Sequence, residues 1–163
     1  MRMTLAILAT CFFLGWGLAR VVEEVRFNQD CGGYLERAAN ANTTQLAEKE
    51  MARALEYIER NKLTEGYTSL LWKTPDEDLG FWYSNLSASL VELRDVRPDA
   101  SQLERSNVLM KLRETLTNTG EHGTELTAPS GISVYPHNMA YCAWAVAAIL
   151  LMAILWPIAL YDM

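Results

Sequence analysis

The chain has 163 residues and a net charge of −6, with 14 Lys and Arg against 20 Asp and Glu. Nucleic-acid binding requires a basic surface, so this balance argues against a nucleic-acid partner. The sequence has no P-loop, GxGxxG, HExxH, CxxC or GxSxG motif, which argues against the enzyme classes that depend on them. We therefore expect a protein that is not an enzyme and has no cofactor.

An apolar run, Met3–Ala19, follows a lone Arg2 at the start of the chain. It is consistent with a secretory signal peptide, with Gly17-Leu18-Ala19 as the cleavage site. It is equally consistent with a retained anchor, because Val21 and Val22 extend the run towards spanning length. We favour a retained transmembrane helix over residues 3–22.

A second apolar run, Met139–Leu160, carries no charged residue. At about 1.5 Å rise per residue it is long enough for a hydrocarbon core of roughly 30 Å. Aromatic side chains that suit the headgroup region lie near both of its ends; they are Tyr141, Trp144, Trp156 and Tyr161. We expect a transmembrane helix over residues 139–160, with only Tyr161, Asp162 and Met163 after it.

Neither apolar run contains an Asp, Glu, Lys, Arg or His. Pumps, channels and transporters normally need such residues within the membrane, so these classes are disfavoured. Small residues, which allow close helix packing, are the candidate intramembrane contacts; they are Gly15, Gly17, Ala140, Ala143 and Ala147. A generic lipid-facing helix is the alternative interpretation of these residues.

The residues between the two runs form one long acidic segment, which we divide into a helical domain over residues 23–118 and an irregular strap over residues 119–138. A long acidic segment can be translocated, whereas Arg2 and the amino terminus favour the cytoplasm. We therefore expect an inner (cytoplasmic) membrane protein with cytoplasmic termini and a periplasmic domain.

The first helix of the domain is predicted from a capping-box pattern, Asn42-Thr43-Thr44-Gln45. Apolar residues then recur at three- and four-residue steps on one face; they are Ala47, Met51, Ala54, Leu55 and Ile58. We expect this helix to end near Asn61.

A second helix is predicted to start at Thr74-Pro75-Asp76-Glu77, which offers a cap, a proline at the first position and acidic residues near the helix N-terminus. A third is predicted after Pro98-Asp99, with Leu103, Leu109, Leu112 and Leu116 as core candidates. The fold class is therefore all-α, with two transmembrane helices flanking an extramembrane antiparallel bundle of about three helices.

Two features near the first span concern backbone and thiol chemistry. Gly32-Gly33 is predicted to break a helix that leaves the membrane. Cys31 is the one cysteine outside the apolar runs, so a disulfide within the domain is excluded. We interpret Cys31 as a buried thiol, with an intermolecular bridge or a reactive thiol as the alternatives. The chain has two histidines, His122 and His137, and these are too few for a typical metal site.

The densest aromatic cluster is Phe81-Trp82-Tyr83, with Tyr67 and Trp72 nearby in the sequence. At about 100° per residue, three adjacent rings on a helix cover roughly 300° of its circumference. One packed face cannot bury them all, so at least one must meet the connector at residues 63–73, the membrane surface, a ligand or a protein. These five residues are the candidate partner interface, with internal packing and a small-molecule pocket as alternatives.

The function favoured by these features is a non-catalytic accessory subunit of a larger integral membrane complex, of the kind that respiratory and photosynthetic complexes hold. Its partners would be that complex and the lipid bilayer. The order of span, helical domain and span resembles the sensory half of a bacterial chemoreceptor or sensor kinase. The alternative is therefore a membrane-anchored periplasmic ligand-binding or regulatory module that signals through a partner chain. A membrane-bound enzyme ranks third and would need paired carboxylates, such as Glu56 or Glu59 facing Asp76.

Overall fold

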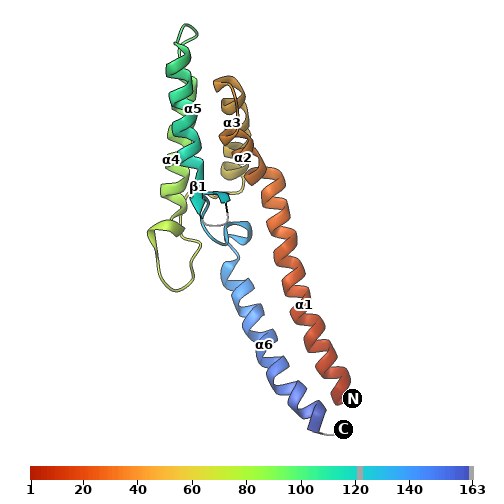
Figure 1. Cartoon of the computed structure of the whole chain (residues 1–163). Helices are drawn as coiled ribbons and strands as arrows, with labels where there is room; N and C mark the ends of the chain where they lie inside the picture. Colours follow the sequence, from red (N-terminus) through yellow and green to blue (C-terminus); the bar gives the residue numbers. More distant parts are fainter. Residues whose placement is uncertain (121–122, 162–163) are drawn as a thin grey trace. The chain divides into compact units, whose positions relative to one another are not determined.

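The computed structural model describes residues 1–120 and 123–161 and is mostly helical (Figure 1). The chain divides into two compact units. We call residues Met1–Val25 with Ser133–Met163 the span unit, and residues Arg26–Ile132 the domain unit.

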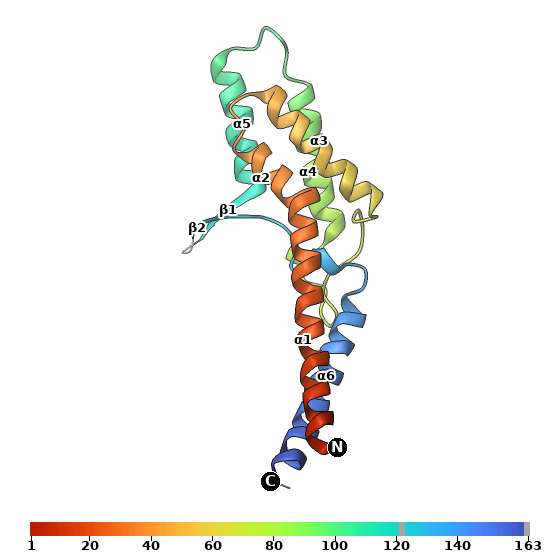
Figure 2. The same cartoon turned by 90° about the vertical axis from the view of Figure 1, so that its right-hand side faces the viewer.

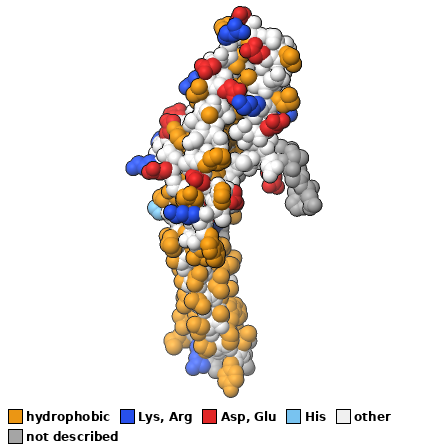
Figure 3. Space-filling view, turned by 90° about the vertical axis from the view of Figure 1, so that its left-hand side faces the viewer, with side chains coloured by type: hydrophobic (Ala, Val, Ile, Leu, Met, Phe, Trp, Pro, Cys, Tyr) orange, Lys and Arg blue, Asp and Glu red, His pale blue; other side chains and the backbone are white. Residues whose placement is uncertain are grey.

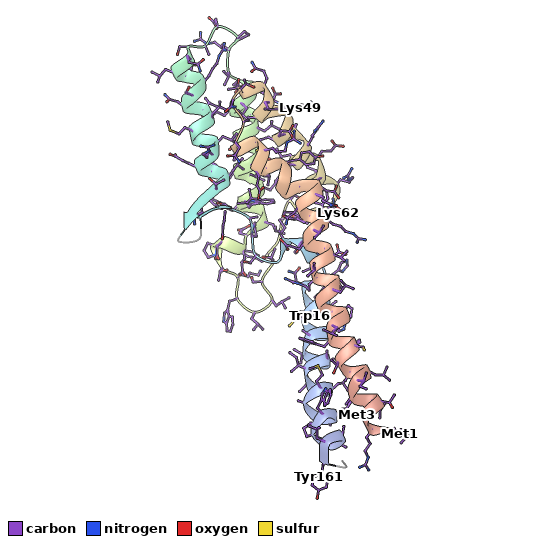
Figure 4. All side chains as sticks on the ribbon, turned by 45° about the vertical axis from the view of Figure 1, so that its right-hand side comes forward. Met1, Met3, Trp16, Lys49, Lys62 and Tyr161 are labelled. Atoms are coloured by element: carbon purple, nitrogen blue, oxygen red, sulfur yellow. The ribbon has the colours of Figure 1, made fainter. Side chains whose placement is uncertain are left out.

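The span unit consists chiefly of helices α1 (Arg2–Phe27) and α6 (Asn138–Tyr161), although the last two residues of α1 belong to the domain unit. Both are long and apolar enough to cross a membrane, as predicted. Met1 and Tyr161, both labelled in Figure 4, lie at the same end of this helix pair. Hydrophobic side chains cover its surface in the face shown in Figure 3.

Helix α1 continues through a π-helical turn, η1 (Asn28–Gly32), into helix α2 (Gly33–Ala39). The predicted break at Gly32-Gly33 is therefore wrong. The turn brings the backbone so close that a Cβ on Gly33 would lie 2.8 Å from the carbonyl oxygen of Asn28. Here glycine allows a helical distortion rather than ending the helix, because it removes the side chain that would block the close approach.

Helix α3 (Thr44–Arg60) confirms the first domain helix. The Thr43 side chain caps it by accepting a hydrogen bond from the Leu46 backbone N–H. Asn61 forms its C-terminal cap. The predicted apolar face is buried throughout, with each of its five residues at most 4% exposed.

Helix α4 (Leu79–Arg94) begins later than the sequence suggests. Thr74-Pro75 opens a separate short 3₁₀ turn, η2 (Pro75–Glu77), and the cap of α4 is Asp78, whose carboxylate accepts a hydrogen bond from the Phe81 N–H. The acidic residues therefore lie before the helix rather than in its first turn. The apolar face of α4 is buried; its residues are Leu79, Trp82, Leu86, Leu90 and Leu93.

Helix α5 (Gln102–Leu116) is capped by Ser101, whose hydroxyl accepts a hydrogen bond from the Glu104 N–H. Leu112 and Leu116 are buried as predicted. Leu103 is wrong as a core residue, because its side chain is 71% exposed in the first turn of the helix.

Part of the predicted irregular strap is a two-stranded antiparallel sheet of β1 (Thr117–Gly120) and β2 (Gly123–Leu126), with Thr117 opposite Leu126. β-branched threonines on both strands suit this geometry. A short turn, η3 (Ile132–Val134), precedes α6. The expectation for His122 lies outside the described residues, whereas His137 is exposed.

In the domain unit, α3 packs against α2 and α4, and α5 packs against the same two helices (Figure 2). The rings of Phe27 and Tyr57 meet near the C-terminal end of α3, with centroids 6.2 Å apart. Trp82, at the start of α4, bonds to Thr127. The chain therefore enters and leaves the domain unit at the same end, which we call the exit end. The turn at residues 95–101 and Leu103 lie at the opposite end of α4.

Candidate functional site

The predicted aromatic cluster does not form one surface, because Trp82 belongs to the core of the domain unit. Its side chain is only 7% exposed. The indole N–H donates a 2.8 Å hydrogen bond to the carbonyl oxygen of Thr127, which ties α4 to the segment after β2. A buried Trp with a satisfied N–H is a structural anchor, so a change at Trp82 would report on folding rather than on docking.

Tyr83 and Tyr67 are half-buried and make contacts within the domain unit. The Tyr83 hydroxyl donates to a Glu59 carboxylate oxygen at 2.8 Å and so joins α4 to α3. The negative charge of Asp78 raises the pKa of Tyr67, and the hydrogen bond that this carboxylate accepts from the hydroxyl adds to the effect. The Lys73 ammonium lies 5.2 Å from the centre of the Tyr67 ring.

A groove of about 340 Å³ lies beside the start of α4 in the domain unit. Phe81, 67% exposed, lines it together with the buried Trp82. Three acidic residues contribute to its lining; they are Asp76, Asp78 and Glu125. The groove could accept an apolar side chain or a small molecule, with a preference for positive charge at its acidic side.

Trp72 lies apart from this groove, on the connector between α3 and η2. Its side chain is 75% exposed and the neighbouring Leu71 is 80% exposed, while Leu70 is also exposed. We call Leu70–Trp72 the apolar tip. The sequence pattern grouped Trp72 with the helix aromatics, whereas the structure places it on a separate loop.

The small residues of the span unit also divide into two groups. Gly15 lies against α6, since a Cβ added there would be 3.7 Å from an atom of the Trp144 ring, whereas a Cβ on Gly17 would meet nothing within 4 Å. On α6, Ala148 and Ala159 are buried. The predicted stripe of Ala140, Ala143 and Ala147 is exposed instead, so it is available to lipid or to another chain.

Three tryptophan N–H groups join the two spans, a feature that the sequence analysis missed. Trp16 donates to the carbonyl oxygen of Tyr141 at 2.9 Å, and Trp144 donates to that of Phe12 at 3.2 Å. Trp156 donates to the Thr10 hydroxyl at 3.0 Å. Figure 4 labels Trp16 on α1, beside α6. The presence of Trp and Thr inside apolar runs was the available signal, but it predicts headgroup anchoring equally well.

Two buried ionisable groups, Glu50 and Cys31, lie in α3 and the π-helical turn. The Glu50 side chain is 1% exposed and pairs with Arg37 at 3.1 Å and Arg53 at 3.8 Å. Cys31 is fully buried, as predicted, and burial together with the charge of Asp30 raises its pKa to about 12. A thiol in this state is a poor nucleophile, because its thiolate form is suppressed.

Within residues 1–120 and 123–161, no group of three or more His, Cys, Asp or Glu side chains is arranged to hold a metal ion. Neither Glu56 nor Glu59 lines the groove that contains Asp76. No family model, no curated protein and no solved structure matches this chain.

Proposed function

We propose that this protein is a non-catalytic, two-span accessory subunit that docks onto a larger integral membrane complex. The observation that carries the proposal is the groove beside α4, where an exposed phenylalanine stands next to a preformed hollow of about 340 Å³. Central aromatic anchors packed into pockets dominate the binding energy of many protein interfaces. Phe81 would enter the partner, and an apolar or basic side chain of the partner would enter the groove.

The span unit offers a second docking surface. Because its indole N–H groups are bonded between α1 and α6, the pair makes its own polar contacts without a further chain. The exposed stripe of Ala140, Ala143 and Ala147 allows a neighbouring helix to approach closely. Packing of α1 against α6 also supports a retained anchor over a cleaved signal peptide. We propose an inner-membrane location with the domain unit on the periplasmic side.

The test is mild-detergent extraction of a tagged chain from its native membranes, followed by native electrophoresis and mass spectrometry. The wild-type chain should migrate with a large complex at a fixed stoichiometry. Phe81→Asp should abolish this co-migration while leaving the thermal unfolding of the purified chain unchanged. Wild-type migration alone, or as a small homo-oligomer, would sink the proposal.

The matched control is Val91→Asp, because Val91 lies on the same helix, is 55% exposed and does not line the groove. This variant carries the same added charge and should remain in the complex. Equal loss of both variants would mean that any charge on α4 disturbs assembly and that the groove has no special role.

A second candidate function is ligand sensing through the same groove, with the signal passed to a partner chain. The groove volume lies within the range of small-molecule sites, and its acidic side chains favour a cationic ligand with an apolar body. Isothermal calorimetry of the purified full-length chain against a library of amines separates the two candidates. Saturable binding that Phe81→Asp changes, together with migration as a free chain, would favour sensing over docking.

A further inference from the structure

The apolar tip, Leu70–Trp72, has features that the groove and the span packing do not explain. It presents consecutive exposed apolar side chains, with Leu71 and Trp72 at 80% and 75% exposure. Four of the five tryptophans donate an indole hydrogen bond within their own unit. Trp72 makes none among the described residues. Runs of exposed apolar residues are unfavourable in water unless something covers them.

The tip is held on a bonded stem rather than on a free loop. The Thr68 backbone N–H donates to the Glu77 carbonyl oxygen at 3.1 Å, and the Leu79 N–H donates to that of Gly66 at 3.0 Å. Tyr67 and Asp78 form a β-bridge between these bonds. Leu63 and Thr68 are buried at the base of the connector. The base is therefore fixed to the domain unit while the tip remains outside its core.

The stem lies at the exit end of the domain unit, where both connections to the apolar helices leave. Asp78 caps α4, and Trp82, one turn later, bonds to Thr127. Only residues 133–137 separate Ile132 from the first residue of α6. At about 3.5 Å per residue they span at most about 20 Å. At the other connection, Phe27, the last residue of α1, packs directly on Tyr57.

We propose that the apolar tip inserts into the membrane–water interface and is a third lipid contact in addition to the two spans. This proposal rests on the membrane location proposed above but not on docking to a complex. Trp suits the interfacial region because its ring is amphipathic, and the two leucines suit the acyl boundary. The Lys73 ammonium, adjacent in sequence, is placed to meet lipid phosphate.

The test uses the full-length chain reconstituted alone into nanodiscs of phosphatidylcholine and phosphatidylglycerol. An environment-sensitive fluorophore is attached at Leu71→Cys in a chain carrying Cys11→Ser and Cys142→Ser. Cys31 is fully buried, and the same chain without Leu71→Cys shows how much fluorophore Cys31 takes up. The matched control is Leu103→Cys. Leu103 is 71% exposed but lies at the end of the domain unit that is opposite the exit end.

Lipids with a nitroxide on the acyl chain should quench the probe at residue 71 several-fold more strongly than the probe at residue 103. Aqueous iodide should show the reverse order. Equal lipid quenching at the two sites would overturn the proposal. So would a probe at residue 71 that is exposed to iodide in nanodiscs and becomes shielded only in native membranes, because a protein would then cover the tip.

A measurement without a label tests the same contact. The emission of the Trp72→Phe variant subtracted from that of the wild-type chain isolates the signal of Trp72. This difference should be blue-shifted in nanodiscs and quenched by brominated lipid; a difference at the wavelength of water-exposed Trp overturns the proposal. Because no partner complex is present, failure here leaves the docking proposal intact, and loss of docking leaves the lipid quenching unchanged.

Discussion

The span unit and the domain unit join their helices by different chemistry. Between α1 and α6 the buried residues are small, chiefly alanines, and three indole N–H groups donate across the pair. In the domain unit the helices bury leucine, isoleucine and methionine, and one indole N–H ties α4 to a loop. At the membrane location proposed above, lipid would provide no hydrophobic driving force between the two helices, so close packing and hydrogen bonds would have to join them. In water, burial of apolar area provides most of the stabilisation.

The largest expected effect comes from removing the aromatic core of the domain unit. Trp82→Ala should lower the free energy of unfolding by about 3–5 kcal/mol, because it leaves a cavity and an unpaired Thr127 carbonyl. Thermal unfolding followed by near-ultraviolet circular dichroism measures this loss. Trp82→Phe keeps most of the volume and should cost less. An unchanged melting curve for Trp82→Ala would contradict the assignment of Trp82 to the core.

The π-helical turn in the domain unit provides the next largest effect. Gly33→Ala should destabilise the chain by about 1–3 kcal/mol, because its Cβ would lie against the Asn28 carbonyl oxygen. Gly17→Ala meets nothing within 4 Å and should stabilise α1 by up to about 1 kcal/mol. Chemical denaturation in detergent compares the two variants. Equal effects of the same sign would show that close approach at Gly33 is not what selects glycine.

The hydrogen bonds between the spans should each contribute less. Trp156→Phe and Thr10→Val each remove one partner of the bond between Trp156 and Thr10, at a cost of about 0.6–2 kcal/mol. A double-mutant cycle, followed by unfolding in mixed micelles, isolates the coupling between the two side chains. Strictly additive losses would mean that the bond does not join the helices.

At neutral pH the smallest effect is that of Cys31, whose ionisation changes the stability only in alkaline solution. Burial raises its pKa from the ordinary value of 9.0 to about 12 in the folded chain, so folding favours the neutral thiol. The corresponding stability is fully present below pH 9 and is lost as the pH rises from about 9 towards 12. Iodoacetamide should therefore label Cys31 slowly at pH 8 in the folded chain and rapidly after unfolding. Rapid labelling of the folded chain would contradict this burial.

Local sequence patterns predicted the apolar helices and α3 well, because periodicity and a strong cap act over a few residues. They predicted the start of α4 less well, because Thr74 and Asp78 both offer a cap and the pairing of Gly66–Thr68 with Glu77–Leu79 favours the second. The sheet at β1 and β2 was missed, since Thr- and Gly-rich segments are typical of loops as well as strands. Leu103 shows that an apolar residue near a helix end need not face the core.

The candidate site was harder to predict than the helices. Adjacent residues 81–83 necessarily point in different directions, but the sequence does not say which ring is buried. Tertiary contacts decide this: Thr127, distant in sequence, bonds to Trp82, whereas Phe81 remains exposed. The exposed position of Trp72 depends on the backbone hydrogen bonds at the stem of the connector. No short-range sequence pattern predicts these bonds. The groove likewise joins residues from α4, α5 and the segment after β2.

At the membrane location proposed above, the inward hydrogen bonds of Trp144 and Trp156 bear on how deeply the two helices would sit in a bilayer. Indole groups that face the headgroups normally resist vertical displacement, but these N–H groups are occupied between the helices. With 24 residues, α6 is about 36 Å long, which exceeds a typical hydrocarbon core of roughly 30 Å. The pair can therefore tilt to match membranes of different thickness.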